Sequence, residues 1–145
     1  MTEAGHLLFV YGTLQRGYPN EHELRVKGTA AFKCEAITMS PYPLAITNQY
    51  FRPWLLDKQG LGHQVAGEVW VLDDACLEYV DAFEGKDFTR TPISVEAPNG
   101  DILSCTSYLV NYERNEEWHG PFLTKYPKEE SLEKYVPPSK RPTVE

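Results

Sequence analysis

Short strand-like segments recur along this chain, and they constrain its fold more than any other feature. Most of them end in Gly, Pro, Asn or Asp, which is typical of β-strands separated by turns. The segments are 7–11, 29–39, 44–46, 54–56, 65–72, 93–97 and 102–110. The pair Asn99-Gly100 between the last two predicts a β-hairpin. Many strands with few helices predict an α+β domain on a mostly antiparallel sheet, which can close into a small barrel.

Helix signals are fewer. The strongest covers 75–83, where Asp73 or Asp74 can cap the first turn and Gly85 follows the last one. Two shorter helices are predicted over 21–26 and 128–135. We therefore expect a few helices at the periphery of the sheet, and none of them forms the core.

The length of 145 residues suits one domain. We expect a domain over residues 1–136 and a flexible tail over 137–145, because the last stretch is polar and contains proline. No apolar run approaches the ~20 residues of a membrane span, and no secretory signal is visible at the N-terminus. The expected setting is therefore the cytosol, without a membrane partner.

Charge and metal-ligand patterns exclude several classes of function. The formal net charge of −7 argues against a nucleic-acid partner, which requires a basic surface. The three cysteines show no CxxC pair and the four histidines show no HxH or HxxxH pair, so we expect no metal site. Isolated cysteines of this kind are typical of a reducing compartment.

The first strand-like segment ends in a candidate binding loop. The apolar residues of 7–10 are followed by Gly12, Gly17 and Pro19, so the chain turns directly at the end of the predicted strand. Glycine allows the backbone to approach a ligand, and successive free N–H groups can hold an anion. From this pattern alone, a plain tight turn is an equal alternative.

Glu84 falls on the apolar side of the predicted helix. Seven residues after Leu77, it lies only about 20° from that leucine on a helical wheel, within the arc that also holds Val80. Burial and the negative end of the helix dipole would both raise the pKa of its carboxyl group. A raised pKa suits a general base that works near neutral pH. The alternative is a last-turn glutamate that swings into solvent.

Five motifs resemble, in the same order along the chain, the γ-glutamyl cyclotransferase-like family and especially its γ-glutamylamine branch. They are 11–20 (YGTLQRGYPN), 41–44 (PYPL), 53–56 (PWLL), 67–70 (GEVW) and 81–84 (DAFE). The resemblance extends from residue 7 to about residue 118, with Gln15 where lysine is usual. It implies a small mixed barrel, mostly antiparallel, with a few peripheral helices.

The resemblance also implies roles for individual residues. Glu84 matches the catalytic glutamate of the family. Tyr11, Gly12, Thr13 and Leu14 match the loop whose backbone holds the glutamyl end of the substrate. Tyr108 lies in a segment similar to a strand beside the active site of related enzymes. We expect all six residues to surround one substrate pocket.

The implied reaction releases 5-oxoproline and a free amine from a γ-glutamyl amine such as γ-glutamyl-ε-lysine. The α-amine of the glutamyl group attacks its own γ-carbonyl, and no cofactor or metal is expected. We expect a monomer whose partner is the small-molecule substrate. The alternatives are a cyclotransferase for another γ-glutamyl amino acid or protected metabolite, and a non-catalytic module that binds a small ligand.

Overall fold

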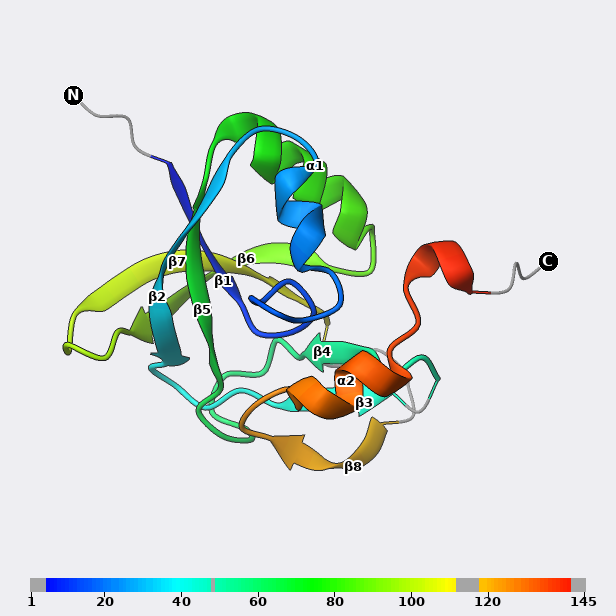
Figure 1. Cartoon of the computed structure of the whole chain (residues 1–145). Helices are drawn as coiled ribbons and strands as arrows, with labels where there is room; N and C mark the ends of the chain where they lie inside the picture. The colour runs from blue at the N-terminus through cyan, green and yellow to red at the C-terminus, as the bar shows by residue number, and fades with distance from the viewer. Residues whose placement is uncertain (1–4, 48, 112–117, 142–145) are drawn as a thin grey trace.

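Five strands close into a barrel, as the computed structural model of the chain shows (Figure 1). The structure describes residues 5–47, 49–111 and 118–141, with only the backbone described over 118–120. In order around the barrel the strands are β1 (His6–Val10), β5 (Ala66–Leu72), β2 (Ala30–Thr38), β6 (Thr89–Glu96) and β7 (Ile102–Leu109). Four neighbouring pairs are antiparallel, and β1 pairs with β7 in parallel. The predicted mixed, mostly antiparallel barrel is therefore confirmed.

A second, smaller sheet lies beside the barrel (Figure 1). Its antiparallel strands, in order, are β4 (Pro53–Leu55), β3 (Leu44–Thr47) and β8 (Trp118–Leu123). The Val110 N–H donates to the Leu55 carbonyl oxygen at 2.9 Å, and the Asp57 N–H donates to the Val110 carbonyl oxygen at 2.8 Å, so the backbone joins this sheet to the end of β7. Strand β8 was not predicted, because Gly120 and Pro121 within it are poor strand formers.

The helices lie outside the barrel (Figure 1). The strongest predicted helix is confirmed as α1 (Asp74–Glu84), which begins where the Asp73 carboxylate accepts from the Cys76 N–H and ends before Gly85 at φ 83°. It packs beside the short 3-10 helix η1 (Glu21–Arg25). Helix α2 (Lys128–Lys134) follows β8, and the chain then forms η2 (Pro138–Lys140).

The structure describes one part of the predicted tail and not the other. Residues 137–141 include η2, whereas 142–145 lie outside the described residues. The division into a domain over 1–136 and a flexible tail over 137–145 stays a prediction. No helix in the described part of the chain is long and apolar enough to cross a membrane.

The core explains why β1 is apolar without alternation. Phe9 points into the barrel interior, where it packs in the same cluster as Val69 and Val95. Leu8 points outwards and packs in the cluster that includes Leu77 of α1. A strand covered on both faces must be apolar throughout, and such burial contributes about 25 cal/mol per Å² of apolar surface. This packing fixes the end of β1 against the end of α1.

Candidate active site

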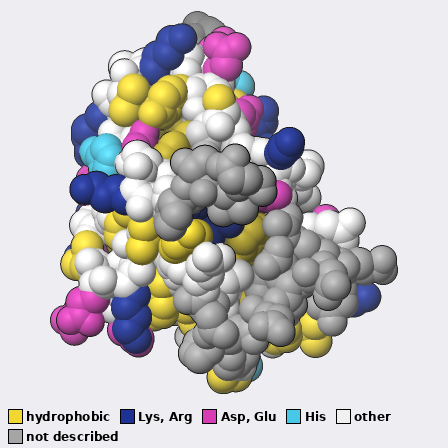
Figure 2. All heavy atoms as spheres, turned by 90° about the vertical axis from the view of Figure 1, so that its right-hand side faces the viewer, with side chains coloured by type: hydrophobic (Ala, Val, Ile, Leu, Met, Phe, Trp, Pro, Cys, Tyr) yellow, Lys and Arg dark blue, Asp and Glu magenta, His cyan; other side chains and the backbone are white. Residues whose placement is uncertain are grey.

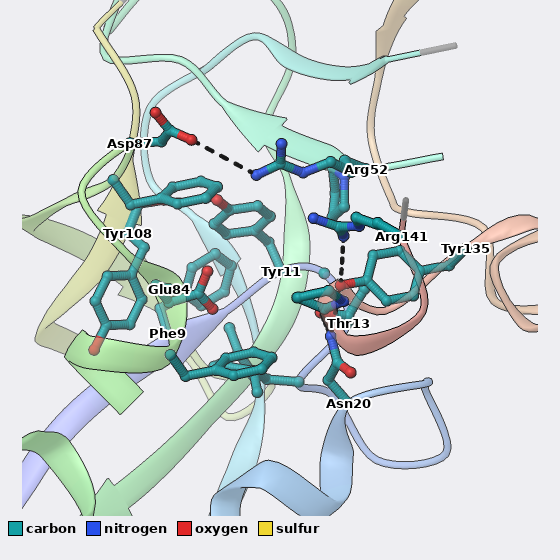
Figure 3. Close-up of a pocket in the computed structure, with 17 residues that line it drawn as sticks. Phe9, Tyr11, Thr13, Asn20, Arg52, Glu84, Asp87, Tyr108, Tyr135 and Arg141 are labelled. Atoms are coloured by element: carbon teal, nitrogen blue, oxygen red, sulfur yellow. Dashed lines mark hydrogen bonds and ion pairs between the residues drawn. The ribbon is translucent and has the colours of Figure 1, made fainter. Parts of the chain in front are cut away.

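A cavity of about 280 Å³ opens where the ends of β1 and α1 meet the start of β4 (Figure 3). All six residues that the sequence singled out line it: Tyr11, Gly12, Thr13, Leu14, Glu84 and Tyr108. A larger hollow of about 750 Å³ lies on the other side of the β1 loop, and none of the six lines it. The smaller cavity is therefore the candidate active site.

Glu84 points into this cavity from the last turn of α1 (Figure 3). Although the residue as a whole is only partly buried, protein atoms surround its carboxyl group, and this desolvation raises the pKa from 4.5 to about 7. The positive charge of Arg52 acts in the opposite direction and keeps the pKa from rising further. No hydrogen bond from another described residue reaches the carboxylate. The acceptor atoms of the Glu84 carboxylate are thus available to a ligand in the cavity.

Two tyrosines stand beside Glu84. The Tyr11 hydroxyl donates to the Tyr108 carbonyl oxygen at 2.6 Å, which links β1 to β7. Burial and the charge of Glu84 hold the pKa of Tyr11 well above its ordinary value, so this tyrosine stays neutral. The Tyr108 hydroxyl instead donates to the Asp81 carboxylate at 2.6 Å, so its ring, and not its hydroxyl, faces the cavity.

Asp81 has a supporting position behind the cavity. Burial acts to raise the pKa of its carboxyl group, but hydrogen bonds from Arg90 and Tyr108 outweigh burial, so the pKa lies below its usual value. Arg90 binds it through two atoms, with Nε at 2.9 Å and Nη2 at 3.1 Å. The ionised carboxylate therefore fixes the Tyr108 ring on one side and the last turns of α1 on the other.

The loop after β1 offers backbone donors to the cavity. Gly12, Thr13 and Leu14 are all buried and all line the cavity. Their N–H groups donate no hydrogen bond to any other described residue. Buried N–H groups in folded proteins are almost always paired, so three successive unpaired ones are suited to a polar or anionic ligand.

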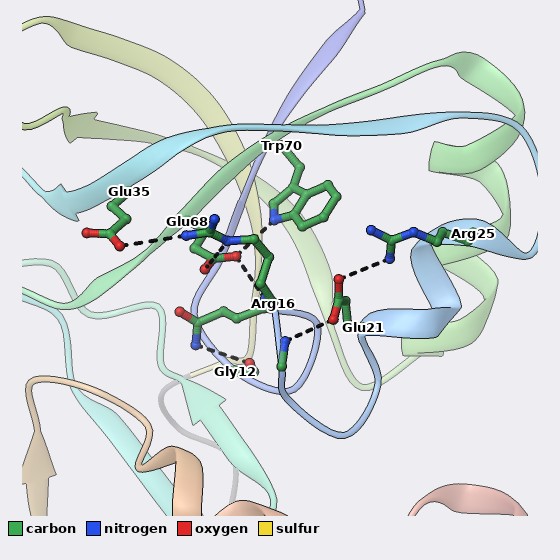
Figure 4. Close-up of polar contacts among 9 residues, drawn as sticks. Gly12, Arg16, Glu21, Arg25, Glu35, Glu68 and Trp70 are labelled. Atoms are coloured by element: carbon green, nitrogen blue, oxygen red, sulfur yellow. Dashed lines mark hydrogen bonds and ion pairs between the residues drawn. The ribbon is translucent and has the colours of Figure 1, made fainter.

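The same loop is held from behind by Glu68 on β5 (Figure 4). Its carboxylate is buried and accepts from the Arg16 N–H at 3.0 Å, the Arg16 Nε at 3.1 Å and the Trp70 Nε1 at 3.1 Å. Gln15 donates to the Gly12 carbonyl oxygen at 3.2 Å, which tightens the turn. A Cβ atom at Gly12 would lie 2.7 Å from Cγ of Pro53, so only glycine allows the loop to approach β4 this closely. These contacts therefore hold the loop in one conformation against β4.

The opposite side of the cavity carries charge from the residue before β4 and from the turn after α1. Arg52 forms an ion pair with Asp87, with Nη2 and Oδ2 4.0 Å apart (Figure 3). Its guanidinium group lies 4.2 Å from the centre of the Trp54 ring, and that ring stacks on Phe88. The preceding residues Tyr50 and Phe51 adopt φ of 66° and 54°, which is strained for residues with a Cβ atom.

Sequence reasoning missed several residues of this cavity. Asn20 belongs to the first motif and donates to the Thr13 hydroxyl at 2.9 Å, and Arg52 directly precedes the motif at 53–56. These two could have been suspected from their positions. Tyr135 and Arg141 are brought to the cavity only by the fold, because they follow Glu84 by more than 50 residues and lie where a helix end and a tail were predicted.

Within the described residues, no group of three or more His, Cys, Asp and Glu side chains is arranged to hold a metal ion. The titratable groups of the cavity are Glu84, Asp87, the two arginines and the tyrosines. The arrangement suits acid–base chemistry on a ligand that carries both a cationic amine, near Glu84, and an anionic group, near the loop amides.

Comparisons with known proteins agree with this geometry. A family model described as gamma-glutamyl cyclotransferase, AIG2-like, matches residues 8–127. A Homo sapiens protein named gamma-glutamylaminecyclotransferase is 48% identical over 94 residues, which make up 62% of this chain and 61% of that protein. A Rattus norvegicus protein of the same name is 33% identical over 140 residues, covering 82% of this chain and 94% of that protein.

A solved structure extends the similarity to the fold. The crystal structure of an AIG2-like protein from Mus musculus superposes with a TM-score of 0.86 at 32% identity, and covers 96% of this chain and 100% of that chain. The human relative is matched over less than two thirds of its own length. The family model ends before α2, so Tyr135 and Arg141 lie outside the stretch that it covers.

Proposed function

Because the chain belongs to the AIG2-like γ-glutamyl cyclotransferase family, we propose that it is a γ-glutamylamine cyclotransferase. It converts a small γ-glutamyl amine into 5-oxoproline and a free amine. The observation that carries the proposal is the Glu84 carboxylate, which has a pKa raised to about 7 and lies in the same cavity as the loop amides.

The reaction begins with a proton transfer. The α-amine of the glutamyl group is mostly an ammonium ion at neutral pH, with a pKa near ~8. Glu84 accepts its proton, and the freed nitrogen attacks the γ-carbonyl carbon of the same molecule. The new C–N bond closes a five-membered ring, and the carbonyl oxygen becomes an oxyanion.

The second half of the reaction returns the proton. The bond between the γ-carbon and the departing nitrogen breaks as the oxyanion reforms the carbonyl, and the protonated Glu84 gives its proton to the leaving amine. The ring nitrogen still carries two protons after the attack, so it gives one to the Glu84 carboxylate, which passes it to the departing amine, and the products are a neutral lactam ring and an ammonium ion. Glu84 therefore ends as it began, and neither a cofactor nor a covalent enzyme intermediate is required. A carboxyl group with a pKa near neutrality serves in both directions.

The loop of residues 11–14 positions the substrate in this proposal. Its unpaired N–H groups bind the α-carboxylate of the glutamyl group or the oxyanion, as preorganised amides do in other active sites. The substrate is a flexible chain that must curl into a ring, and holding such a geometry can lower a barrier by up to ~7–11 kcal/mol in the best cases. Tyr11 and Tyr108 shape the wall on which the ring closes.

The experiment measures 5-oxoproline released from γ-glutamyl-ε-lysine and from γ-glutamyl-alanine. We expect turnover of γ-glutamyl-ε-lysine, and a fall in kcat of about 10²–10⁴-fold in Glu84→Gln, which keeps the shape of the side chain but cannot act as a base. The matched control is Glu78→Gln, an exposed residue of the same helix, which should leave kcat unchanged.

Three results would redirect the proposal. Normal turnover in a folded Glu84→Gln protein would remove Glu84 as the base. Turnover of γ-glutamyl-alanine alone would indicate a cyclotransferase for γ-glutamyl amino acids. Binding of 5-oxoproline without release from either substrate would favour a non-catalytic module that binds a small ligand.

The proposal includes a monomer in the cytosol. Cys34, Cys76 and Cys105 are all free thiols, which a reducing compartment preserves. The net charge of −7 disfavours nucleic acid as a partner. Size-exclusion chromatography with light scattering should give a mass near 16.6 kDa, and a mass twice as large would contradict the monomer.

A further inference from the structure

The C-terminal segment of residues 135–141 forms one side of the cavity. Tyr135, Pro138 and Arg141 all line it, together with Glu84. Figure 2 shows the face of the molecule that carries this segment, where hydrophobic side chains surround a basic side chain near the centre. This side of the cavity therefore comes from residues that the family model does not cover.

Hydrogen bonds hold the segment against the β1 loop and the residues before β4. Asn20 Nδ2 donates to the Tyr135 hydroxyl at 2.9 Å and also to the Thr13 hydroxyl at 2.9 Å. The Val136 N–H donates to the carbonyl oxygen of Tyr50 at 3.3 Å. The segment is thus tied to the same loop that offers its amides to the cavity.

Within the described part of the chain, the guanidinium group of Arg141 is oriented by hydrogen bonds but is not neutralised by a carboxylate. Its Nε donates to the Val136 carbonyl oxygen at 2.7 Å, and its Nη2 donates to the Tyr135 hydroxyl at 3.2 Å (Figure 3). Its carbon Cζ lies 5.0 Å from the centre of the Tyr50 ring. Within the described residues, Nη1 makes no hydrogen bond and no carboxylate lies within ion-pair distance of the group.

Arg52, the other arginine of the cavity, differs in this respect because Asp87 forms an ion pair with it. A guanidinium group that two neutral acceptors and an aromatic ring hold in place is preorganised to bind a carboxylate, since its planar fork matches that shape. We therefore expect the hydrogen-bond acceptor for Nη1 of Arg141 to belong to a molecule that binds in the cavity.

We propose that Arg141 is a substrate-binding residue that holds a carboxylate of the γ-glutamyl amine. This inference rests on the proposed function and adds a specificity-determining residue to it. The carboxylate comes either from the glutamyl group itself or from the leaving amine, as in an amine that is an amino acid. The two sources differ in which half of the substrate Arg141 selects.

The test compares ligands that differ only in a carboxylate. For the glutamyl end, the competitive inhibitors are 5-oxoproline and 2-pyrrolidinone, which is the same ring without the carboxylate. For the leaving amine, the substrates are γ-glutamyl-6-aminohexanoate and γ-glutamyl-n-pentylamine. Each is measured with the wild-type protein, Arg141→Gln, Arg141→Lys and the control Lys140→Gln, which removes an exposed neighbouring charge that does not line the cavity.

We expect Arg141→Gln to weaken a carboxylate ligand by about tenfold or more, because a charge-assisted hydrogen bond is lost, while the matched ligand without the carboxylate changes less than twofold. Arg141→Lys should keep part of the affinity that Arg141→Gln loses. Lys140→Gln should bind all four ligands as the wild type does. A selective loss with 5-oxoproline assigns the glutamyl carboxylate to Arg141. A selective loss with γ-glutamyl-6-aminohexanoate assigns the carboxylate of the leaving amine.

Equal affinities in wild type and Arg141→Gln for all four ligands would overturn the proposal, as would equal losses with and without the carboxylate, which indicate a structural role. If Arg141→Gln fails to fold, Arg141→Lys takes its place and Lys140→Gln remains the control. A selective loss of affinity for the carboxylate ligands in Arg141→Lys then supports the proposal, and its absence overturns the proposal. If the wild-type protein releases no 5-oxoproline, the proposed function fails. Calorimetric binding of the inhibitor pair and of the two leaving-amine compounds then still decides the role of Arg141.

Discussion

At the scale of single residues, the site depends on two opposing effects on the pKa of one carboxyl group, that of Glu84. Burial disfavours the ionised form of Glu84 and Arg52 favours it, and the result is a pKa of about 7. A fully paired glutamate would be too weak a base, and one without a nearby cation would stay protonated at neutral pH. The position of Arg52 therefore tunes the pKa of Glu84, and with it the proposed acid–base chemistry.

Removing the charge of Arg52 should shift the pH profile of activity. In Arg52→Gln the pKa of Glu84 is expected to rise further, because the positive charge that lowers it is lost. The acid limb of kcat/KM then moves to higher pH, so activity at about pH 6 falls several-fold more than activity at about pH 9. The pH dependence of 5-oxoproline release measures this.

Lys86→Gln is the control for that measurement, since Lys86 is exposed and does not line the cavity. Its acid limb should coincide with that of the wild type. An Arg52→Gln profile that falls by the same factor at every pH would show that Arg52 acts on substrate binding and not on the pKa of Glu84.

At the scale of elements, the β1 loop and the end of α1 are brought together by two different kinds of contact. Apolar packing of Leu8 against the cluster of Leu77 sets the position of α1 on the barrel. The buried Glu68 carboxylate sets the shape of the loop through its three hydrogen bonds. Loss of either contact should therefore change the geometry of the site, although none of the residues that form these contacts is proposed to bind the substrate.

Glu68→Ala tests the second contact. We expect the free energy of unfolding to fall by about 1–3 kcal/mol, because the buried Nε1 of Trp70 and the partly exposed donors of Arg16 lose a charged acceptor. We also expect KM to rise more than kcat falls, since the loop that is proposed to bind the substrate loosens. Urea denaturation and steady-state kinetics measure the two effects.

Glu35→Gln is the matched control, because Glu35 also meets Arg16, at 3.7 Å, but with a side chain that is 72% exposed. Exposed ion pairs contribute only about 0–1 kcal/mol, so both stability and KM should stay close to wild type. A Glu68→Ala protein as stable as Glu35→Gln would mean that the loop holds its shape without this acceptor.

At the scale of the whole molecule, the sequence predicted most of the strands and the inward direction of Glu84. Alternation and the Asn99-Gly100 turn were sufficient for the β6–β7 hairpin, because those signals are local. Seven-residue spacing from Leu77 indicated an inward Glu84, because a helix has a fixed period, but it left a solvent-facing side chain as an alternative until the family resemblance favoured the inward position. Both are properties of a few neighbouring residues.

The remainder depends on contacts between distant parts of the chain. The parallel pairing of β1 with β7 joins residues about 100 positions apart, and no local pattern specifies it. Contacts with Tyr50 and Tyr135, and the hydrogen bond from Asn20 to Tyr135, hold Arg141 at the cavity. Its local sequence is polar and contains proline, and for that reason the sequence predicted a flexible tail there. Residues that only tertiary contacts bring together are the ones that sequence reasoning missed.

The free energy of unfolding of the whole molecule should depend on pH through the ionisation of Glu84. Its pKa is 4.5 when exposed and about 7 when folded, so the folded state binds the proton more tightly. The contribution to stability is therefore fully present below about pH 4.5 and is lost as pH rises through about 7. The difference in unfolding free energy between the wild type and Glu84→Gln should fall by up to about 3 kcal/mol from pH 4.5 to pH 8.

Denaturation of both proteins at a series of pH values measures this difference, with Glu78→Gln as the control whose difference from wild type should not change in the same pH range. A constant difference between wild type and Glu84→Gln would mean that the carboxyl group is solvated in the folded protein.

The measurement that bears most directly on the central claim is the titration of Glu84 itself. Carbon-13 NMR of the glutamate side-chain carboxyls, with the Glu84 signal assigned by its absence in Glu84→Gln, gives the pKa in the folded protein. The account predicts a midpoint at about 7 that coincides with the acid limb of kcat/KM for 5-oxoproline release. A midpoint near the ordinary value of 4.5, or full activity on the acid side of the titration, would contradict it.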